Sequence, residues 1–134
     1  MSISDRQLVN AATAVRSNAY APFSHYTVGA AVLDEHGELH VGCNVENSSF
    51  PCGSCAEAGA ISAMVAAGGT RIVAIAAVGG RDTLEECTPC GNCRQRISEF
   101  ADTNTRILLL DTDGKIQSSS IEELLPGSFR LSSS

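Results

Sequence analysis

The sequence predicts a three-layer α/β/α domain in which a mixed sheet of five strands lies between helices. A continuous apolar run over 72–78, and a segment over 105–110 that ends in Ile-Leu-Leu-Leu, are typical of strands that are covered on both faces. A hairpin pattern precedes them, and segments with helical periodicity surround them. Because helices and strands that alternate after a hairpin cover both faces of one sheet, this order indicates an α/β fold. Residues 1–134 are expected to form one domain around one core.

The chain begins with a predicted helix. Ser4 and Gln7 form a capping-box pattern, and apolar residues then recur at helical spacing, which predicts a helix over about residues 5–18. Pro22 disfavours helical geometry in the residue before it. We therefore expect residues 20–25 to form a loop.

A β-hairpin is predicted next. Residues 26–33 are rich in Val and Ala, and residues 38–45 alternate apolar and polar side chains. The Asp-Glu-His-Gly sequence between these two segments has the composition of a tight turn. A loop is expected over residues 46–54.

The centre of the chain predicts two helices with a strand between them. Residues 55–67 are rich in Ala, their larger apolar residues have helical spacing, and a Gly-Gly pair ends the segment. The strand 72–78 follows, and then a loop over residues 79–89 that is long enough to form the rim of a functional site. The second helix is expected from Cys93 to about Phe100.

The C-terminal part contributes smaller elements. Residues 115–118, after the strand 105–110, predict a weak edge strand. Ser120 and Glu123 form a second capping-box pattern, which predicts a short helix that Pro126 ends.

Charge and composition disfavour several classes of protein. The formal net charge is -6, and the nine Lys and Arg residues are spread thinly, which disfavours a nucleic acid as the partner. No apolar run approaches the roughly 20 residues that a membrane span needs, and the N-terminus does not resemble a signal peptide. The six cysteines are expected to be reduced thiols or metal ligands. We therefore expect a cytoplasmic protein that acts on a small molecule.

Cysteines near two predicted helix starts suggest a zinc site. Cys55 begins the first of these helices, and Cys90 and Cys93 are close enough in sequence to point the same way at the start of the second. A helix N-terminus lowers the pKa of a cysteine placed there, which favours the metal-binding thiolate. Three thiolates and a carboxylate, Glu57, that need not be a ligand predict a catalytic Zn²⁺ site with an open fourth position.

A structural zinc site is the alternative interpretation of the same cysteines. Cys52 and Cys55, together with Cys90 and Cys93, have the spacing of a four-cysteine site. That interpretation describes a zinc-stabilised binding protein without catalysis, and it predicts that mutation of Cys52 releases the metal. Cys87 is a further candidate ligand, but it lies in a loop before Pro89, and this position argues against metal binding.

Two motifs resemble the signature of the zinc-dependent cytidine deaminases in the form that binds its metal through three cysteines. These are the Cys-Ala-Glu motif at 55–57 and the Pro-Cys-Gly-Asn-Cys-Arg-Gln motif at 89–95. The resemblance covers most of the chain in order, because four further segments are similar to that family: 20–24, 28–31, 42–47 and 123–129.

The resemblance implies a catalytic or metal-binding role for four residues of the two motifs. Cys55, Cys90 and Cys93 would bind zinc, whose bound water would attack C4 of a pyrimidine. Glu57 would take a proton from that water, pass it to N3 and then protonate the leaving ammonia.

The resemblance also implies contacts with a nucleoside. Asn44 and Glu46 match positions that hold the ribose hydroxyls, although either residue could simply form a turn at the end of a strand. Tyr26 matches an aromatic residue that lies against the base, and a core position is its alternative. Ala56 belongs to the same implied set of substrate contacts.

A homotetramer is a further implication of the resemblance. Phe50 and Phe129 match aromatic residues that the family contributes to the pocket of a neighbouring subunit. The alternative for Phe129 is that it caps the core of its own chain.

One residue departs from the family pattern. The family usually has an arginine after its Cys-Ala-Glu motif, and this chain has Ala58. Three thiolates on Zn²⁺ leave a net negative charge, which weakens the metal as a Lewis acid. We expect a side-chain donor, Asn92 or Arg94, to hydrogen-bond one of the sulfurs instead.

The sequence therefore predicts a zinc-dependent enzyme that deaminates cytidine and 2′-deoxycytidine by hydrolysis. Blasticidin S deaminase, a relative of the family, also lacks the arginine. The alternative is accordingly a deaminase of another aminopyrimidine or of a related nucleoside.

Overall fold

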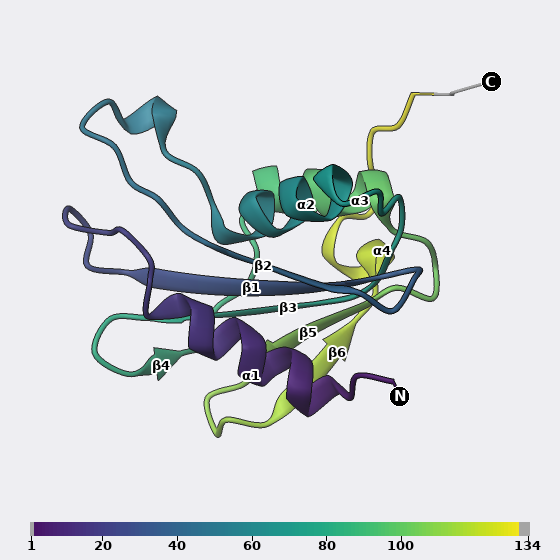
Figure 1. The fold of residues 1–134 in the computed structure, drawn as a ribbon, viewed down its shortest axis with the longest axis horizontal. Coiled ribbons are helices and arrows are strands. Elements are labelled where there is room, and N and C mark those ends of the chain that lie inside the picture. The colour runs from purple at the N-terminus through teal and green to yellow at the C-terminus, as the bar shows by residue number, and fades with distance from the viewer. Residues whose placement is uncertain (1, 132–134) are drawn as a thin grey trace.

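The computed structural model describes residues 2–131 and confirms the three-layer arrangement (Figure 1). The elements in chain order are α1 (Asp5–Arg16), β1 (Thr27–Asp34), β2 (Leu39–Cys43), a 3-10 turn (Phe50–Cys52), α2 (Ala56–Ala66), β3 (Ile72–Gly80), β4 (Leu84–Glu85), α3 (Gly91–Phe100), β5 (Arg106–Leu110), β6 (Ile116–Ser119) and α4 (Ile121–Leu124). Helix α1 covers one face of the sheet, and the other three helices lie on the opposite face. No helix within the described residues is long and apolar enough to cross a membrane.

The sheet is mixed, with strand order β2-β1-β3-β5-β6. Strand β1 is antiparallel to both β2 and β3, whereas β3 and β5 are parallel because α3 crosses between them. These five strands are the predicted ones, and β4 adds a short sixth strand that pairs with the end of β3 inside the segment expected to be a loop. This strand has two residues, both of them exposed, so no periodicity or burial pattern marks it in the sequence.

Two apolar clusters fill the spaces between the layers. Below the sheet, Leu8, Val9 and Ala12 of α1 pack against inward-facing residues of β1, β3 and β5. Above it, Ala60 and Met64 of α2 join residues from α3 and α4. Strand β3 is buried at almost every position, as its continuous apolar run predicts for a strand with helices on both faces.

Backbones approach closely where α2 crosses β2. A Cβ atom built on Gly42 would lie 2.4 Å from the amide nitrogen of Ala60 and 2.5 Å from the carbonyl oxygen of Ala56. Both atoms belong to the backbone of α2, so neither can move without the helix moving. Only glycine at this position allows α2 to settle on the sheet.

We expect the substitution Gly42→Ala to destabilise the protein by about 3 kcal/mol, because the new methyl group displaces α2. Urea unfolding followed by circular dichroism measures the change. Gly59→Ala is the matched control, because a Cβ on Gly59 faces the same strand at 3.5 Å or more, an ordinary contact. This control should keep or raise stability, since alanine favours a helix by up to about 1 kcal/mol over glycine. Equal effects of the two substitutions would contradict the close approach at Gly42.

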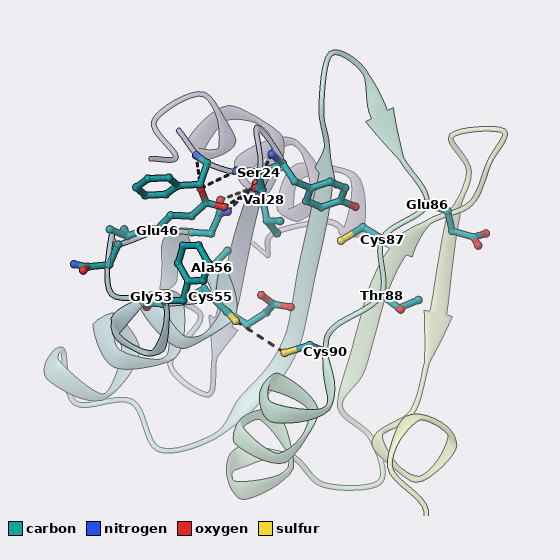
Figure 2. A pocket seen from close by; sticks show the side chains of 18 residues that line it. Ser24, Val28, Glu46, Gly53, Cys55, Ala56, Glu86, Cys87, Thr88 and Cys90 are labelled. Carbon is teal, nitrogen blue, oxygen red and sulfur yellow. Dashed lines mark hydrogen bonds between the residues drawn. The ribbon is translucent and has the colours of Figure 1, made fainter. Parts of the chain in front are cut away.

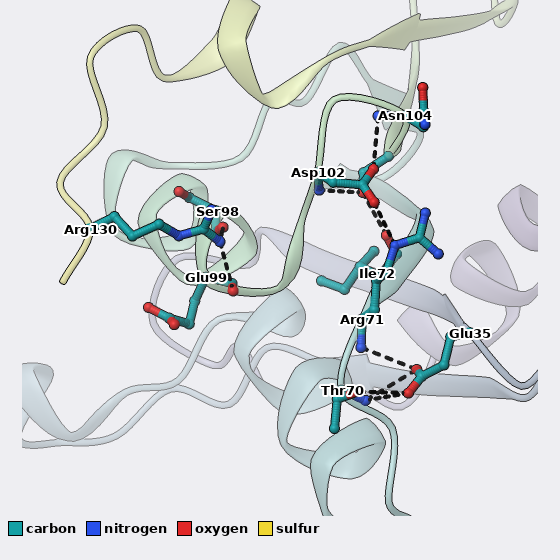
Figure 3. A network of polar contacts seen from close by, with 10 residues as sticks. Glu35, Thr70, Arg71, Ile72, Ser98, Glu99, Asp102, Asn104 and Arg130 are labelled. Carbon is teal, nitrogen blue, oxygen red and sulfur yellow. Dashed lines mark hydrogen bonds and ion pairs between the residues drawn. The ribbon is translucent and has the colours of Figure 1, made fainter. Parts of the chain in front are cut away.

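Hydrogen bonds and an ion pair join three loops at the ends of strands (Figure 3). Glu35, in the turn after β1, accepts hydrogen bonds from the backbone N–H groups of Thr70 and Arg71. The Thr70 hydroxyl also donates to Glu35 and is the main reason that its pKa falls to about 2. The Arg71 guanidinium pairs with Asp102 at 2.6 Å. These contacts connect the hairpin to the loops that precede β3 and β5.

The C-terminal segment lies against α3. The Arg130 guanidinium donates to the carbonyl oxygens of Ser98 and Glu99 (Figure 3). The side chain of Gln95 donates to the carbonyl oxygen of Phe129. The Phe129 side chain is nevertheless 67% exposed, so it does not cap the core of its own chain.

Candidate active site

Three thiols meet at the N-termini of α2 and α3. The sulfur atoms of Cys55, Cys90 and Cys93 all lie within 4.8 Å of one another. Figure 2 shows Cys55 and Cys90, whose sulfurs are 3.9 Å apart. Among the described residues, neither Cys52 nor Cys87 joins this group. The geometry therefore favours a three-thiol site over the four-cysteine alternative.

Helix capping positions the cysteines. Cys55 and Cys90 are the N-cap residues of α2 and α3, and both have extended backbone conformations. The Cys93 backbone N–H donates to the Cys90 sulfur at 3.4 Å, so this sulfur occupies the place of a capping oxygen. Helix α3 consequently starts at Gly91, earlier than the predicted start at Cys93. The sequence does not reveal this start because cysteine is not a common capping residue.

The three thiols affect one another's ionisation. Burial raises the pKa of Cys93, and the carboxylate of Glu57 and the other two sulfurs raise it further. Burial opposes ionisation of Cys90 as well, but hydrogen bonds led by the Cys93 N–H outweigh burial and lower the pKa of Cys90. Three sulfur atoms crowded in this way are a donor set that suits zinc, because a divalent cation offsets their mutual repulsion.

Glu57 follows Cys55 by two residues and lies in the first turn of α2. Its side chain is only 4% exposed, and burial raises its pKa. The carboxylate lines the same cavity as Cys55 and Cys90. It is not a member of the metal-ligand group formed by the three sulfurs. Glu57 is therefore placed beside the candidate metal centre, where a carboxylate can exchange protons without binding the ion.

The cavity has a volume of about 890 Å³, which is ample for a nucleoside. Four of the six predicted substrate contacts line it, namely Tyr26, Asn44, Glu46 and Ala56. Phe50, which the resemblance assigns to the pocket of a neighbouring subunit, also lines the cavity of its own chain. The sixth, Phe129, is not among the lining residues of this chain. The cavity lies between the hairpin, the N-terminus of α2 and the loop before α3 (Figure 2).

Asn44 and Glu46 already make hydrogen bonds within the chain. The Asn44 amide accepts from the N–H of Val28 and donates to the carbonyl oxygen of Tyr26. The Glu46 carboxylate accepts from the backbone N–H groups of Phe23 and Ser24 and from the Ser24 hydroxyl. The Ser24 hydroxyl is the main cause of a lowered pKa at Glu46. Both side chains shape the pocket wall, and each keeps capacity for a further hydrogen bond.

The loop between β3 and α3 does form part of the rim, as its length predicts. Glu86, Cys87 and Thr88 line the cavity (Figure 2). Sequence reasoning assigned no role to these three residues, and it also missed Ser24 and Phe23. Phe23 and Ser24 fall in segment 20–24, which is similar to the family, whereas nothing in the local pattern of the other three residues distinguishes them.

The expectation that Asn92 or Arg94 donates to a sulfur was wrong. The Arg94 guanidinium donates to the carbonyl oxygens of Pro89 and Leu124, both at 2.8 Å. The Asn92 side chain accepts from Arg96. The thiolate charge is instead offset by the backbone N–H of Cys93 and by the partial positive charges at the N-termini of α2 and α3. Arg94 instead holds the loop that precedes Cys90.

The chain is similar to deaminases of known sequence and structure. A family model described as the cytidine and deoxycytidylate deaminase zinc-binding region matches residues 2–109. The cytidine deaminase of Halalkalibacterium halodurans is 40% identical over 126 residues, which cover 93% of this chain and 94% of that protein. The blasticidin-S deaminase of Bacillus cereus is 32% identical over 128 residues, with 91% and 89% covered.

A solved structure is similar in both fold and sequence. The crystal structure of cytidine deaminase from Burkholderia pseudomallei has a TM-score of 0.85 to this chain and 38% sequence identity. The alignment covers 94% of this chain and 99% of that one. The similarity therefore extends from the thiol site to the whole domain.

Proposed function

This chain belongs to the cytidine and deoxycytidylate deaminase family, and we propose that it hydrolyses cytidine and 2′-deoxycytidine to uridine and 2′-deoxyuridine, with release of ammonia. One observation carries the proposal: three thiols from two helix N-termini lie beside a buried carboxylate in a cavity of nucleoside size. Residues 1–134 act as a single deaminase domain in this proposal.

Cys55, Cys90 and Cys93 hold the metal ion, and Glu57 moves protons. Zinc in such a site supplies Lewis-acid chemistry that generates a nucleophile from water at neutral pH. Glu57 accepts one proton from the attacking water and delivers it to the ring nitrogen N3. It then accepts a second proton, from the hydroxyl group added at C4, and delivers it to the leaving amino group. Burial suits this exchange, because a carboxylate with a raised pKa works both as base and as acid near neutral pH.

The wall that contains Asn44 and Glu46 binds the sugar. Glu46 is an ionised acceptor that the Ser24 hydroxyl and backbone N–H groups hold in place, so it is ready to accept a hydrogen bond from a ribose hydroxyl. Tyr26 and Ala56 lie against the base. Because these side chains are already held by bonds within the chain, little order is lost when the substrate binds.

A homotetramer would complete the pocket. Phe50 is 75% exposed and Phe129 is 67% exposed, which is unusual for large aromatic side chains on a monomer. We assign both to contacts with neighbouring subunits, and sedimentation equilibrium measures the subunit count. A cytoplasmic location is part of the same proposal, because six free cysteines suit a reducing compartment. The net charge of -6 disfavours a nucleic-acid substrate.

The second candidate function is deamination of a related aminopyrimidine nucleoside of the blasticidin S type. Ala58, which is uncharged and lies next to Glu57, favours it, as does the similarity to a blasticidin-S deaminase. A panel of cytidine, 2′-deoxycytidine, cytosine and blasticidin S separates the candidates when absorbance loss and ammonia release are followed. We expect the highest kcat/KM for cytidine or 2′-deoxycytidine. A preference for blasticidin S would replace the first candidate by the second, and turnover of none of the four would reject both.

A further inference from the structure

A wall of the substrate cavity is formed by two residues that meet over a glycine. Tyr26 precedes β1, Cys87 lies in the loop before α3, and both side chains reach Gly79 of β3. A Cβ atom on Gly79 would lie 3.0 Å from Tyr26 Cε1 and 3.1 Å from Cys87 Sγ. The ring and the thiol therefore lie directly against the strand, and both line the cavity.

The Cys87 thiol and the Tyr26 ring lie beside each other against Gly79. Burial raises the pKa of Tyr26 to about 12, and the neighbouring Cys87 raises it further. Cys87 is half-buried and stands outside the group of metal ligands. Its sulfur faces the cavity as part of the wall, and the loop around it also contributes Glu86 and Thr88 (Figure 2).

Cys87 lies at the reacting end of the cavity. Glu57 and Cys87 line the same cavity, and the Glu57 carboxylate adds to burial in raising the pKa of the Cys87 thiol. Three residues after Cys87, Cys90 enters the metal centre. Asn44 and Glu46, which we assign to the sugar, come from the hairpin and the loop that follows it. A nucleoside whose sugar lies at Glu46 and whose amino group lies at Glu57 therefore presents the amino-bearing edge of its ring to this wall.

We propose that Cys87 is a specificity-determining residue whose size sets how large a substituent the cavity admits on the amino-bearing edge of the pyrimidine, at C5 or at N4. The inference rests on the proposed deaminase function. Thiol size is the relevant property, because Tyr26 and Gly79 fix the position of the sulfur from two sides. A methyl-sized change in an apolar wall alters kcat/KM by about 10- to 200-fold between substrates that differ by that group.

The test compares Cys87→Ala and Cys87→Leu with the unaltered enzyme on cytidine, 5-methylcytidine and N4-methylcytidine. The measured quantity is kcat/KM of each methylated substrate divided by that of cytidine. We expect the alanine variant to raise this ratio by about 10-fold or more for at least one methylated substrate, and the leucine variant to lower it. The substrate that responds tells whether the wall faces C5 or N4. Ratios within about twofold of the unaltered enzyme for both variants would overturn the inference.

Two further measurements keep the result interpretable. Cys43→Ala removes a half-buried free thiol that does not line the cavity, and it should leave both ratios unchanged. Competitive inhibition by uridine and by 5-methyluridine reports fit without turnover, so it also applies to a variant with low activity. If the unaltered enzyme deaminates cytidine while every ratio stays constant, only the role of Cys87 fails. If it does not deaminate cytidine, the proposed function itself fails.

Discussion

Replacing Glu57 by glutamine should lower kcat for cytidine by about 10²- to 10⁴-fold, the usual contribution of a positioned general acid and base. Glutamine has almost the same shape as glutamate but cannot accept or deliver the proton. The side chain is buried at the start of α2 beside the three sulfurs, and its carboxylate is not one of the grouped ligands. The variant should therefore keep zinc at one ion per chain, as measured by atomic absorption on the purified protein.

The control for this variant is Glu38→Gln, which makes the same chemical change in the exposed turn between β1 and β2. It should keep the activity of the unaltered enzyme. Retention of more than about a tenth of kcat by Glu57→Gln would remove this residue from the proton transfers. Loss of zinc from the same variant would instead make Glu57 a ligand, contrary to its position outside the three-sulfur group.

Replacing Cys93 by serine should remove both the metal and the activity. Cys93 is fully buried, and its sulfur lies within 4.8 Å of each of the other two, so a hydroxyl at this position cannot supply the thiolate that the site needs. The loss in zinc affinity should exceed the roughly 10- to 100-fold that follows from loss of an outer-shell partner. Zinc content after dialysis against a chelator of known affinity measures it.

Cys52→Ser is the matched control, because Cys52 is exposed and its sulfur lies outside the group. This variant should keep zinc and turnover at the level of the unaltered enzyme. The comparison decides between the two interpretations of the cysteine spacing. If Cys52→Ser lost its metal as Cys93→Ser does, the site would be a structural four-cysteine centre and the catalytic assignment would fail.

The two helix N-termini explain how this site can work without an arginine beside it. Ala58 leaves the position after Glu57 uncharged, and Arg94 is occupied with carbonyl oxygens. The negative charge of the thiolates is met by the partial positive charges of α2 and α3 and by the backbone N–H of Cys93. These contributions come from the backbone, so substitution of side chains on the two helices leaves them in place.

Local sequence was sufficient for the main elements and for the three cysteines that meet in one cluster. Apolar periodicity predicts α1, α2 and the buried strands β3 and β5, because each pattern arises within one element and its own two faces. The spacing of Cys90 and Cys93, with Cys55 and Glu57 at another helix start, predicts a zinc site because the geometry within one helical turn is nearly invariant. The two-residue strand β4 escaped prediction, since its pairing with β3 leaves no periodic signal.

Only the tertiary structure decided what surrounds the metal centre. Arg94 donates to the carbonyl oxygen of Leu124, and Tyr26 and Cys87 both contact Gly79. These residues are far apart in the sequence, so no local pattern predicts the contacts. The same is true of Glu46, whose carboxylate is held by Ser24 in another loop. Hydrogen bonds and van der Waals contacts depend on distances of a few ångströms, and folding sets these distances between segments whose sequences carry no information about each other. The sequence by itself thus determined the fold class and the chemistry of the ligands, whereas packing decided the shape of the pocket and the partners of its polar groups.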